Sequence, residues 1–325
     1  MKAILCNKLG LPEDLVLQEI EQPTPQSTEV LIRVHACGLN FPDTLIIQGK
    51  YQFKPDLPFS PGSDIAGVIM AIGSEVKHLK VGDEVLAITP WGGLSELMVI
   101  EESRVFPKLK EMDFTIAASF MMTYATSYHA LKDRAELKKG ETLLVLGASG
   151  GVGITAIELG KLMGATVIAA ASTDKKLAVC KSKGADHLVN YSTENLKERV
   201  KELTGGRGVD VVYDPVGGDY SEAALRATAW KGRFLVVGFA AGSIPRIPLN
   251  LALLKGCSIV GVFTGAFTVR EKEKSIANSQ QLLKWYQKGR IQPYLHAVYP
   301  LSETAKALRE IMDRKAMGKI VISMQ

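Results

Sequence analysis

A cluster of small residues near the middle of the chain has the composition and spacing needed to bind a phosphate group. The segment 147–153 follows the apolar run 143–146 and precedes a helical pattern. Small residues allow a sharp turn and a close approach to phosphate oxygens, and the helix start offers unpaired N–H groups. The pattern Ala148-x-Gly150-x-x-Gly153, with Ala148 in place of the first glycine of the usual fingerprint, therefore predicts a pyrophosphate site for a dinucleotide. The alternative is a glycine turn without a ligand.

The residues after the next apolar run distinguish NAD from NADP. The strand expected at 166–171 ends in alanines followed by Ser172, without the acidic side chain that binds the ribose hydroxyls of NAD. Lys175 and Lys176 follow and supply positive charge for a 2′-phosphate. This pattern predicts NADPH as the cofactor. Asp174 is the counter-evidence, although it suits a helix cap better, and a solvated helix face is the alternative role for the lysines.

A parallel sheet is needed to position these residues, and the hydrophobic pattern predicts one. Between about 124 and 264, apolar strand-length runs alternate with helical patterns, which favours a doubly wound parallel sheet. The first 120 residues instead carry short apolar stretches between Pro and Gly turns, typical of β-structure. We expect parallel strands at 142–146, 166–171, 187–190, 209–213, 234–237 and 258–262. We expect helices at 115–132, 272–288 and 302–313, and a final strand at 319–323.

Composition argues against several classes of protein. The 325 residues favour two domains, and 46% hydrophobic with 22% charged residues is ordinary for a globular protein. A net charge of +5 spread along the chain does not argue for nucleic acid. No apolar run is long enough to span a bilayer, and no secretory signal is expected. The four cysteines lie far apart, without metal-ligand spacing or a disulfide framework, so we expect a reducing, cytoplasmic setting.

Six motifs in one order carry a family resemblance over essentially the whole chain. They lie at 38–44, 61–67, 81–85, 148–153, 213–218 and 318–321. Together they resemble the zinc-independent quinone oxidoreductase (zeta-crystallin-like) group of the medium-chain dehydrogenase/reductase family. The resemblance implies an α/β protein in which a GroES-like β-rich substrate domain, residues 1–123 plus 265–325, contains an inserted Rossmann domain at 124–264. The active site would lie in the cleft between them.

The resemblance also implies chemistry without a metal. Zinc-dependent relatives carry a cysteine where this chain has Asn40, and histidine and glutamate where it has Ser63 and Asp64. A zinc site needs about three such ligands. Without zinc, the easier reaction is reduction of a quinone or another electron-poor double bond, with hydride from NADPH.

Three residues of the first domain are the candidates for catalysis. Tyr51 is the first candidate proton donor, because tyrosine is protonated at neutral pH, and lining a pocket is its alternative role. Asn40 could bind the substrate oxygen or the cofactor ribose, or fix a turn beside Gly38. Asp43 is expected to support this loop by accepting backbone N–H groups. Leu45 stands where related enzymes often have an aromatic residue, which weakens the case for a stacked quinone ring.

Family position predicts a larger set of cofactor contacts. The set is Thr126, Gly238, Phe239, Val262, Phe263 and Thr264 near the nicotinamide, Ser149, Gly150, Gly151 and Val152 at the pyrophosphate, and Ser172, Lys176 and Tyr191 around the adenine and 2′-phosphate. Arg314 is a further phosphate candidate, with a surface helix arginine as its alternative.

Two other functions stay open. The segment 43–51 resembles that of mitochondrial-type enoyl-thioester reductases, in which the tyrosine is the donor, so the acceptor could be a 2-enoyl thioester on CoA or acyl carrier protein. A non-catalytic NADPH-binding protein, as the lens crystallins of this family suggest, is the second alternative. Relatives dimerise through edge strands, so we expect 259–263 to pair with its twofold mate in a homodimer.

Overall fold

The computed structural model describes residues 1–324. Its contacts divide the chain into two units. Unit 1 consists of Met1–Met122 with Pro293–Gln325, and unit 2 consists of Thr123–Gln292. Each unit has its own hydrophobic core, and each is described separately. No helix within residues 1–324 combines the length and apolar character required to cross a membrane.

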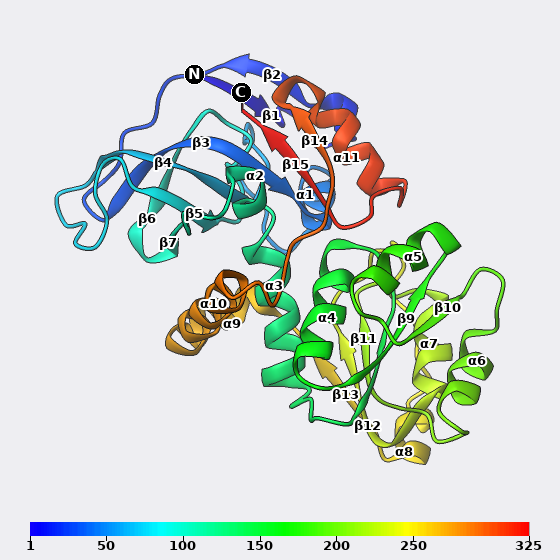
Figure 1. The fold of residues 1–325 in the computed structure, drawn as a ribbon. Helices are drawn as coiled ribbons and strands as arrows, with labels where there is room; N and C mark the ends of the chain where they lie inside the picture. Colours follow the sequence, from blue (N-terminus) through cyan, green and yellow to red (C-terminus); the bar gives the residue numbers. More distant parts are fainter. Residues whose placement is uncertain (325) are drawn as a thin grey trace. The chain divides into compact units, whose positions relative to one another are not determined.

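Unit 1 is built on a seven-stranded sheet with the order β14-β15-β3-β4-β5-β7, in which β6 also pairs with β3. All pairs in it are antiparallel except β14 with β15, and β1 pairs with β2 in a separate ribbon. The strands are β1 (Lys2–Leu5), β2 (Val16–Glu19), β3 (Glu29–Leu39), β4 (Asp64–Ile72), β5 (Glu84–Ile88), β6 (Leu97–Glu101), β7 (Val105–Pro107), β14 (Leu295–Pro300) and β15 (Lys319–Ser323). The helices are α1 (Phe41–Ile46), α2 (Phe114–Ala117) and α11 (Thr304–Met312) (Figure 1).

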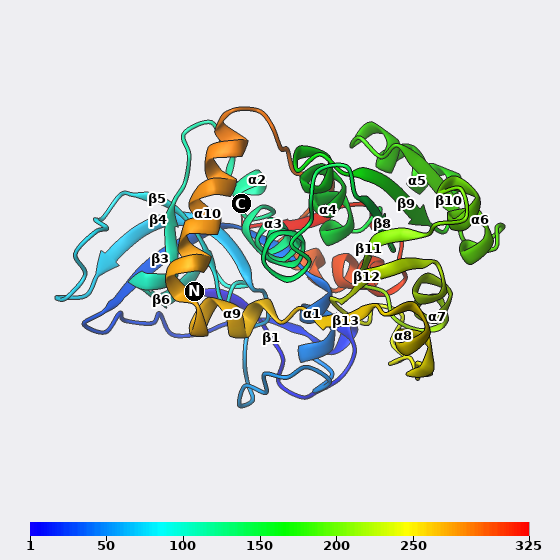
Figure 2. The same cartoon turned by 90° about the horizontal axis from the view of Figure 1, so that it is seen from below.

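Unit 2 contains a six-stranded parallel sheet with the order β10-β9-β8-β11-β12-β13. Its strands are β8 (Thr142–Val145), β9 (Thr166–Ala171), β10 (His187–Asn190), β11 (Val209–Asp214), β12 (Thr228–Val236) and β13 (Ser258–Gly261). The connecting helices are α4 (Gly151–Leu162), α5 (Asp174–Ser182), α6 (Leu196–Leu203), α7 (Asp219–Arg226) and α8 (Asn250–Lys255). Figure 2 shows α4 and α5 on one face of this sheet and α7 and α8 on the other. The expected doubly wound parallel sheet is confirmed.

The central strands of this sheet are buried on both faces, as expected for a parallel sheet covered by helices. Leu143, Leu144 and Val145 of β8 are fully buried, and they pair in register with Val211 to Tyr213 of β11. The carboxyl ends of β8 and β11 therefore lie side by side at the point where the strand order reverses, which is where open α/β sheets bind ligands.

The helix expected at 115–132 is interrupted. α2 ends at Ala117, α3 (Met121–Tyr128) begins after a break, and a π-helical segment, His129–Arg134, follows. The break lies just before the point, between Met122 and Thr123 in the first turn of α3, at which the chain passes from unit 1 to unit 2. α2 packs on β3 and β4 of unit 1, whereas the π-helical segment contacts α4 of unit 2.

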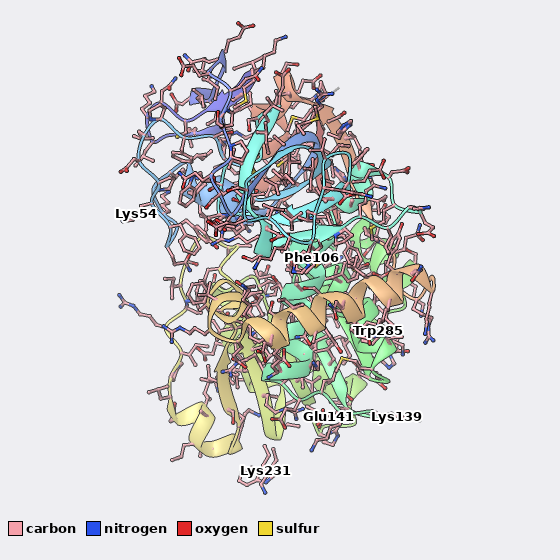
Figure 3. The ribbon with its side chains drawn as sticks, turned by 90° about the vertical axis from the view of Figure 1, so that its left-hand side faces the viewer. Lys54, Phe106, Lys139, Glu141, Lys231 and Trp285 are labelled. Carbon is pink, nitrogen blue, oxygen red and sulfur yellow. The ribbon has the colours of Figure 1, made fainter. Side chains whose placement is uncertain are left out.

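The return to unit 1 also differs from the expected boundary at 265. α9 (Thr264–Arg270) and α10 (Lys272–Gln287) belong to unit 2, and unit 1 resumes at Pro293. Aromatic contacts hold both helices there: the ring of Phe267 stacks on His129 at 3.8 Å, and Trp285 meets Tyr128 at 5.1 Å. Figure 3 labels Trp285 on α10. The expected strand 319–323 forms β15 with the same bounds.

Candidate active site

The helix start that follows β8 is suited to an anion. Gly150 is the N-cap residue of α4 with φ of −77° and ψ of 171°, and no side chain caps the first turn. The N–H groups of Gly151 and Val152 therefore belong to an uncapped first turn of a 12-residue helix. Such groups, with the positive end of the helix dipole, bind phosphate.

The turn itself requires small residues. Gly147 has a φ of 54°, in the left-handed region that favours glycine. A Cβ on Gly153 would lie 2.5 Å from the Gly147 carbonyl oxygen and 2.7 Å from that of Ala148, so the third glycine of the pattern lets α4 pack against the turn. The backbone N–H of Ala148 donates to Ala170 of β9 across 3.0 Å. The residues present thus fit a dinucleotide pyrophosphate.

Two of the residues expected around a 2′-phosphate lie together at the end of β9. Lys176 Nζ donates to Ser172 Oγ across 3.2 Å. Thr173 Oγ1 accepts the Lys176 backbone N–H and caps α5, and Asp174 instead accepts a hydrogen bond from Asn190 at 2.9 Å. A cation and a hydroxyl therefore occupy the place where an acidic residue would bind an unphosphorylated ribose.

The predicted adenine contact Tyr191 lies directly after β10. Its ring is tilted against that of Tyr220 on α7, with the ring centroids 4.2 Å apart. Tyr191 follows β10 and Tyr220 follows β11, and β10 pairs with β9, the strand that precedes Ser172 and Lys176. An aromatic surface of this kind suits a stacked base.

The loops predicted to line the nicotinamide are joined at the same edge of the sheet. The backbone N–H of Gly238 donates to Asp214 across 3.3 Å, and Ala240, just after Phe239, donates to Pro215 across 3.1 Å. The N–H of Val262 donates to Val236 across 2.9 Å. Phe263 is half exposed, and the Thr264 hydroxyl is buried without a hydrogen-bond partner within residues 1–324.

A buried polar cluster beneath the phosphate-binding turn was missed by the sequence analysis. Ser127, next to the expected nicotinamide contact Thr126, has its Oγ 2.9 Å from the Val152 carbonyl, 2.8 Å from Thr155 Oγ1 and 2.9 Å from the Tyr213 hydroxyl. The cluster joins α3, α4 and β11, so it holds the first turn of α4 in place. The one sequence signal for this cluster is that Tyr213 belongs to the family motif at 213–218.

In unit 1, the three expected catalytic residues lie on and after α1. Asn40 is the N-cap residue of α1, and its backbone N–H donates to Asp43 Oδ2 across 2.7 Å. Asn40 Nδ2 lies 3.3 Å from the Gly38 carbonyl and 3.4 Å from Ser63 Oγ. Asp43 thus accepts a backbone N–H of its own loop, and Asn40 lies beside Ser63, another of the three positions at which the resemblance places zinc ligands in zinc-dependent relatives.

A buried lysine completes this cluster. Lys319, the first residue of β15, donates to Asn40 Oδ1 across 2.7 Å and to Asp64 Oδ2 across 3.2 Å. Burial raises the pKa of Asp43 and of Asp64 to about 6, against the opposing effect of the Lys319 ammonium. The sequence alone predicts no role for Lys319, because lysines are usually exposed and nothing local in the sequence shows that this one is buried.

Tyr51 follows the turn at Gly49 and packs its ring against the unit 1 core. Its ring meets that of Phe53 edge-on at 5.7 Å, and its hydroxyl has no hydrogen-bond partner among the described residues. Burial, and then the nearby Asp43 carboxylate, raise the pKa of this hydroxyl, so it stays protonated at neutral pH. Arg314 lies in unit 1 in the turn after α11, with φ of 57°.

The side chains that could bind a metal ion are not clustered in the described part of the chain. Among the side chains of residues 1–324, no three of His, Cys, Asp or Glu gather as ligands of one ion. Asn40 and Ser63 present an amide and a hydroxyl to each other instead.

Comparisons with known proteins agree with both units. A family model described as "Alcohol dehydrogenase GroES-like domain" matches residues 26–110, and one described as "Zinc-binding dehydrogenase" matches 151–282. The quinone oxidoreductase-like protein 2 homolog of Nematostella vectensis is 38% identical over 99% of this chain and 88% of its own length.

Two solved structures are informative. Escherichia coli quinone oxidoreductase, crystallised with NADPH, is 30% identical with a TM-score of 0.94, over 99% of this chain and 100% of the other. The CurK enoyl reductase is 28% identical with a TM-score of 0.90, over 100% of this chain and 99% of the other. The chain therefore belongs to the quinone oxidoreductase family of medium-chain dehydrogenases/reductases, with the expected GroES-like and Rossmann parts.

Proposed function

We propose that this protein is a zinc-independent reductase that uses NADPH to reduce a quinone or another activated enone. The observation that carries the cofactor assignment is the Lys176–Ser172 pair at the end of β9, where an acidic residue would select NAD. The full-length similarity to a quinone oxidoreductase crystallised with NADPH supports it. When bound, NADPH supplies the hydride.

The chain's own residues bind the cofactor and supply hydrogen-bond donors. The uncapped first turn of α4, at Gly151 and Val152, binds the pyrophosphate, and Ser172 with Lys176 binds the 2′-phosphate. Tyr51 holds a proton on a hydroxyl without an internal partner and donates it to the reduced acceptor. Asn40 stabilises the negative charge that develops on the acceptor oxygen through its Nδ2 donor.

The proposed chemistry does not use zinc. Asn40 and Ser63 stand at positions that hold ligands in zinc-dependent relatives, and neither an amide nor a hydroxyl is among zinc's usual protein ligands. The hydride acceptor must therefore be electron-poor by itself, as a quinone or a conjugated enone is.

Reduction of an enoyl thioester is the second candidate. The observation that favours it is the free hydroxyl of Tyr51, which suits protonation of the enolate carbon or oxygen, together with the similarity to an enoyl reductase over the whole chain. Leu45, which offers no ring for a quinone to stack on, is compatible with both candidates.

We further propose a homodimer in the cytoplasm. β13 is the last strand of its sheet, and Ile259 on it and Phe263 just after it are exposed, so a second copy could continue the sheet. The four cysteines, at 6, 37, 180 and 257, form no disulfide within the described residues, which fits a reducing compartment.

The test is NADPH oxidation with two acceptors in parallel, a 1,4-quinone and a trans-2-enoyl thioester. Faster turnover of the quinone supports the proposal. Faster turnover of the thioester would replace it with the enoyl reductase. NADPH binding without turnover of either would favour the non-catalytic, crystallin-like alternative.

A further inference from the structure

Lys319 is a buried lysine of unit 1 that pairs with a buried carboxylate, and the proposed chemistry does not use it. Its side chain is only 4% exposed, and that of its ion-pair partner Asp64 is 1% exposed. Burying an ammonium group costs free energy unless charge and hydrogen bonds compensate for it. Such a group at the base of a candidate site needs a reason beyond stability, because a buried ion pair by itself contributes little.

The local backbone makes room for this lysine. A Cβ on Gly38 would lie 3.2 Å from Lys319 Nζ and 1.9 Å from the Ala118 carbonyl oxygen, so only glycine fits there. Gly38 pairs with Val321 and Asp64 across the neighbouring strands. β3, β4 and β15 therefore bring Asn40, Asp64 and Lys319 together, although the last of them is far from the others in sequence.

The contact between Lys319 and Asn40 determines which end of the amide faces which neighbour. An ammonium group has donors and no acceptor, so the Asn40 atom 2.7 Å from Nζ must be the carbonyl oxygen. The NH₂ group of Asn40 then points to Gly38 and Ser63, at 3.3 and 3.4 Å. Both contacts are long, so these hydrogens are only weakly engaged.

A positive charge on the oxygen side of an amide also strengthens the N–H groups on its other side, because hydrogen bonds in a chain polarise one another in a low-dielectric interior. Lys319 would thus act on Asn40 twice: it fixes the amide orientation and makes Nδ2 a stronger donor. A donor set in advance is what stabilises charge that develops on a carbonyl or quinone oxygen.

From this arrangement we infer that Lys319 is a positioning residue that holds Asn40 as a polarised hydrogen-bond donor toward the acceptor oxygen. This inference rests on the proposed reductase function and adds to it a residue outside every expected site. Asp64 serves as the counter-charge, and its second oxygen, Oδ1, is buried without a hydrogen bond within residues 1–324.

The test is a double-mutant cycle between Lys319→Met and Asn40→Ala, measured on the full-length protein with NADPH and a 1,4-quinone. We expect Lys319→Met to lower kcat by about 10- to 100-fold with little change in the NADPH dissociation constant. In the Asn40→Ala background, the same change should lower kcat by less than about twofold, because the residue through which it acts is gone. Losses that multiply in the double variant would overturn the inference.

Two further variants separate positioning from folding. Lys319→Met combined with Asp64→Asn removes the charges of both members of the ion pair, and we expect it to keep the loss in kcat; recovery of the wild-type rate would mean that Lys319 only neutralises Asp64. Lys108 is the matched control, because its side chain is also 4% exposed and its Nζ donates to Met112 across 2.6 Å. We expect Lys108→Met to lower the melting temperature without changing kcat.

A second readout does not depend on activity. In ¹⁵N-labelled protein with NADPH, the side-chain NH₂ signals of Asn40 can be assigned by their loss in Asn40→Ala. We expect these signals to shift in Lys319→Met and to stay in place in Lys108→Met. Unmoved signals in Lys319→Met would overturn the inference even if the enzyme is active, whereas a wild-type protein that reduces no quinone would overturn the proposed function alone.

Discussion

Lys176 donates a hydrogen bond to Ser172 across 3.2 Å, immediately after the second strand of the parallel sheet. The contact brings a cation and a hydroxyl to the place where the sequence lacks an acidic residue. A 2′-phosphate would interact with both groups, whereas a ribose hydroxyl would gain little from the charge.

The first prediction concerns cofactor selection. Lys176→Ala should weaken NADPH binding by about 10- to 100-fold, the cost of a charge-assisted hydrogen bond, and change NADH binding by less than about threefold. Binding is measured by nicotinamide fluorescence, with Lys181→Ala, an exposed lysine near the other end of α5, as the control. Equal losses for the two cofactors would refute the 2′-phosphate role.

The second prediction concerns the proton donor. Tyr51→Phe should lower turnover of an enoyl or quinone acceptor by about 100-fold or more, since general acid catalysis typically contributes that much. NADPH affinity should stay unchanged. Tyr299→Phe removes the same atom from β14 of the same unit and serves as control. A rate equal to that of the wild type would show that Tyr51 is not the proton donor and only lines the pocket.

The third prediction concerns stability against pH. Burial raises the pKa of Asp43 from 3.8 to about 6, so the folded chain binds this proton more tightly than the unfolded chain. Ionisation of this carboxyl group therefore lowers the free energy of unfolding as pH rises from about 4 to 6. The decrease is about 3 kcal/mol at most for two pKa units.

Asp43→Asn should remove this contribution. Its free energy of unfolding relative to the wild type, from urea titrations, should increase between pH 4 and pH 7. The exposed Asp56→Asn should show a flat difference over the same range. A difference that is flat or falls for Asp43→Asn would show that its pKa is not raised.

The fourth prediction concerns assembly. Ile259→Lys places a charge on the open edge of β13 and should convert a dimer into a monomer, measured by size-exclusion chromatography with light scattering at micromolar concentration. Ile72→Lys is matched, since both isoleucines are 39% exposed, and should leave the mass unchanged. NADPH binding should survive in both. A wild-type protein that is monomeric would contradict the dimer.

The parallel sheet could be predicted closely because its signals are local. Strands β9 and β10 have the expected bounds, 166–171 and 187–190, since each contains consecutive apolar residues and lies between helical patterns or turn residues. The helix expected at 115–132 was wrong as a single element, because nothing local marks the point near Met122 where the chain changes unit.

The candidate site was only partly predictable for the same reason. The turn at Gly150 and the lysine at 176 follow from short motifs, and so could be named in advance. The contact between Lys319 and Asn40 joins residues that are distant in sequence, and only the pairing of β15 with β3 brings them together. The Ser127–Tyr213 contact likewise depends on how α3 packs on the sheet.

In the proposed function, the protein passes hydride from NADPH to an electron-poor acceptor without zinc. The most direct measurement is the steady-state rate of loss of the nicotinamide absorbance with a 1,4-quinone, in chelator-treated buffer, with NADPH and with NADH. We predict quinone-dependent oxidation that persists after chelation and favours NADPH by about tenfold or more in kcat/KM. No quinone-dependent oxidation by a protein that binds NADPH, or activity that is lost on chelation and restored by zinc, would contradict it.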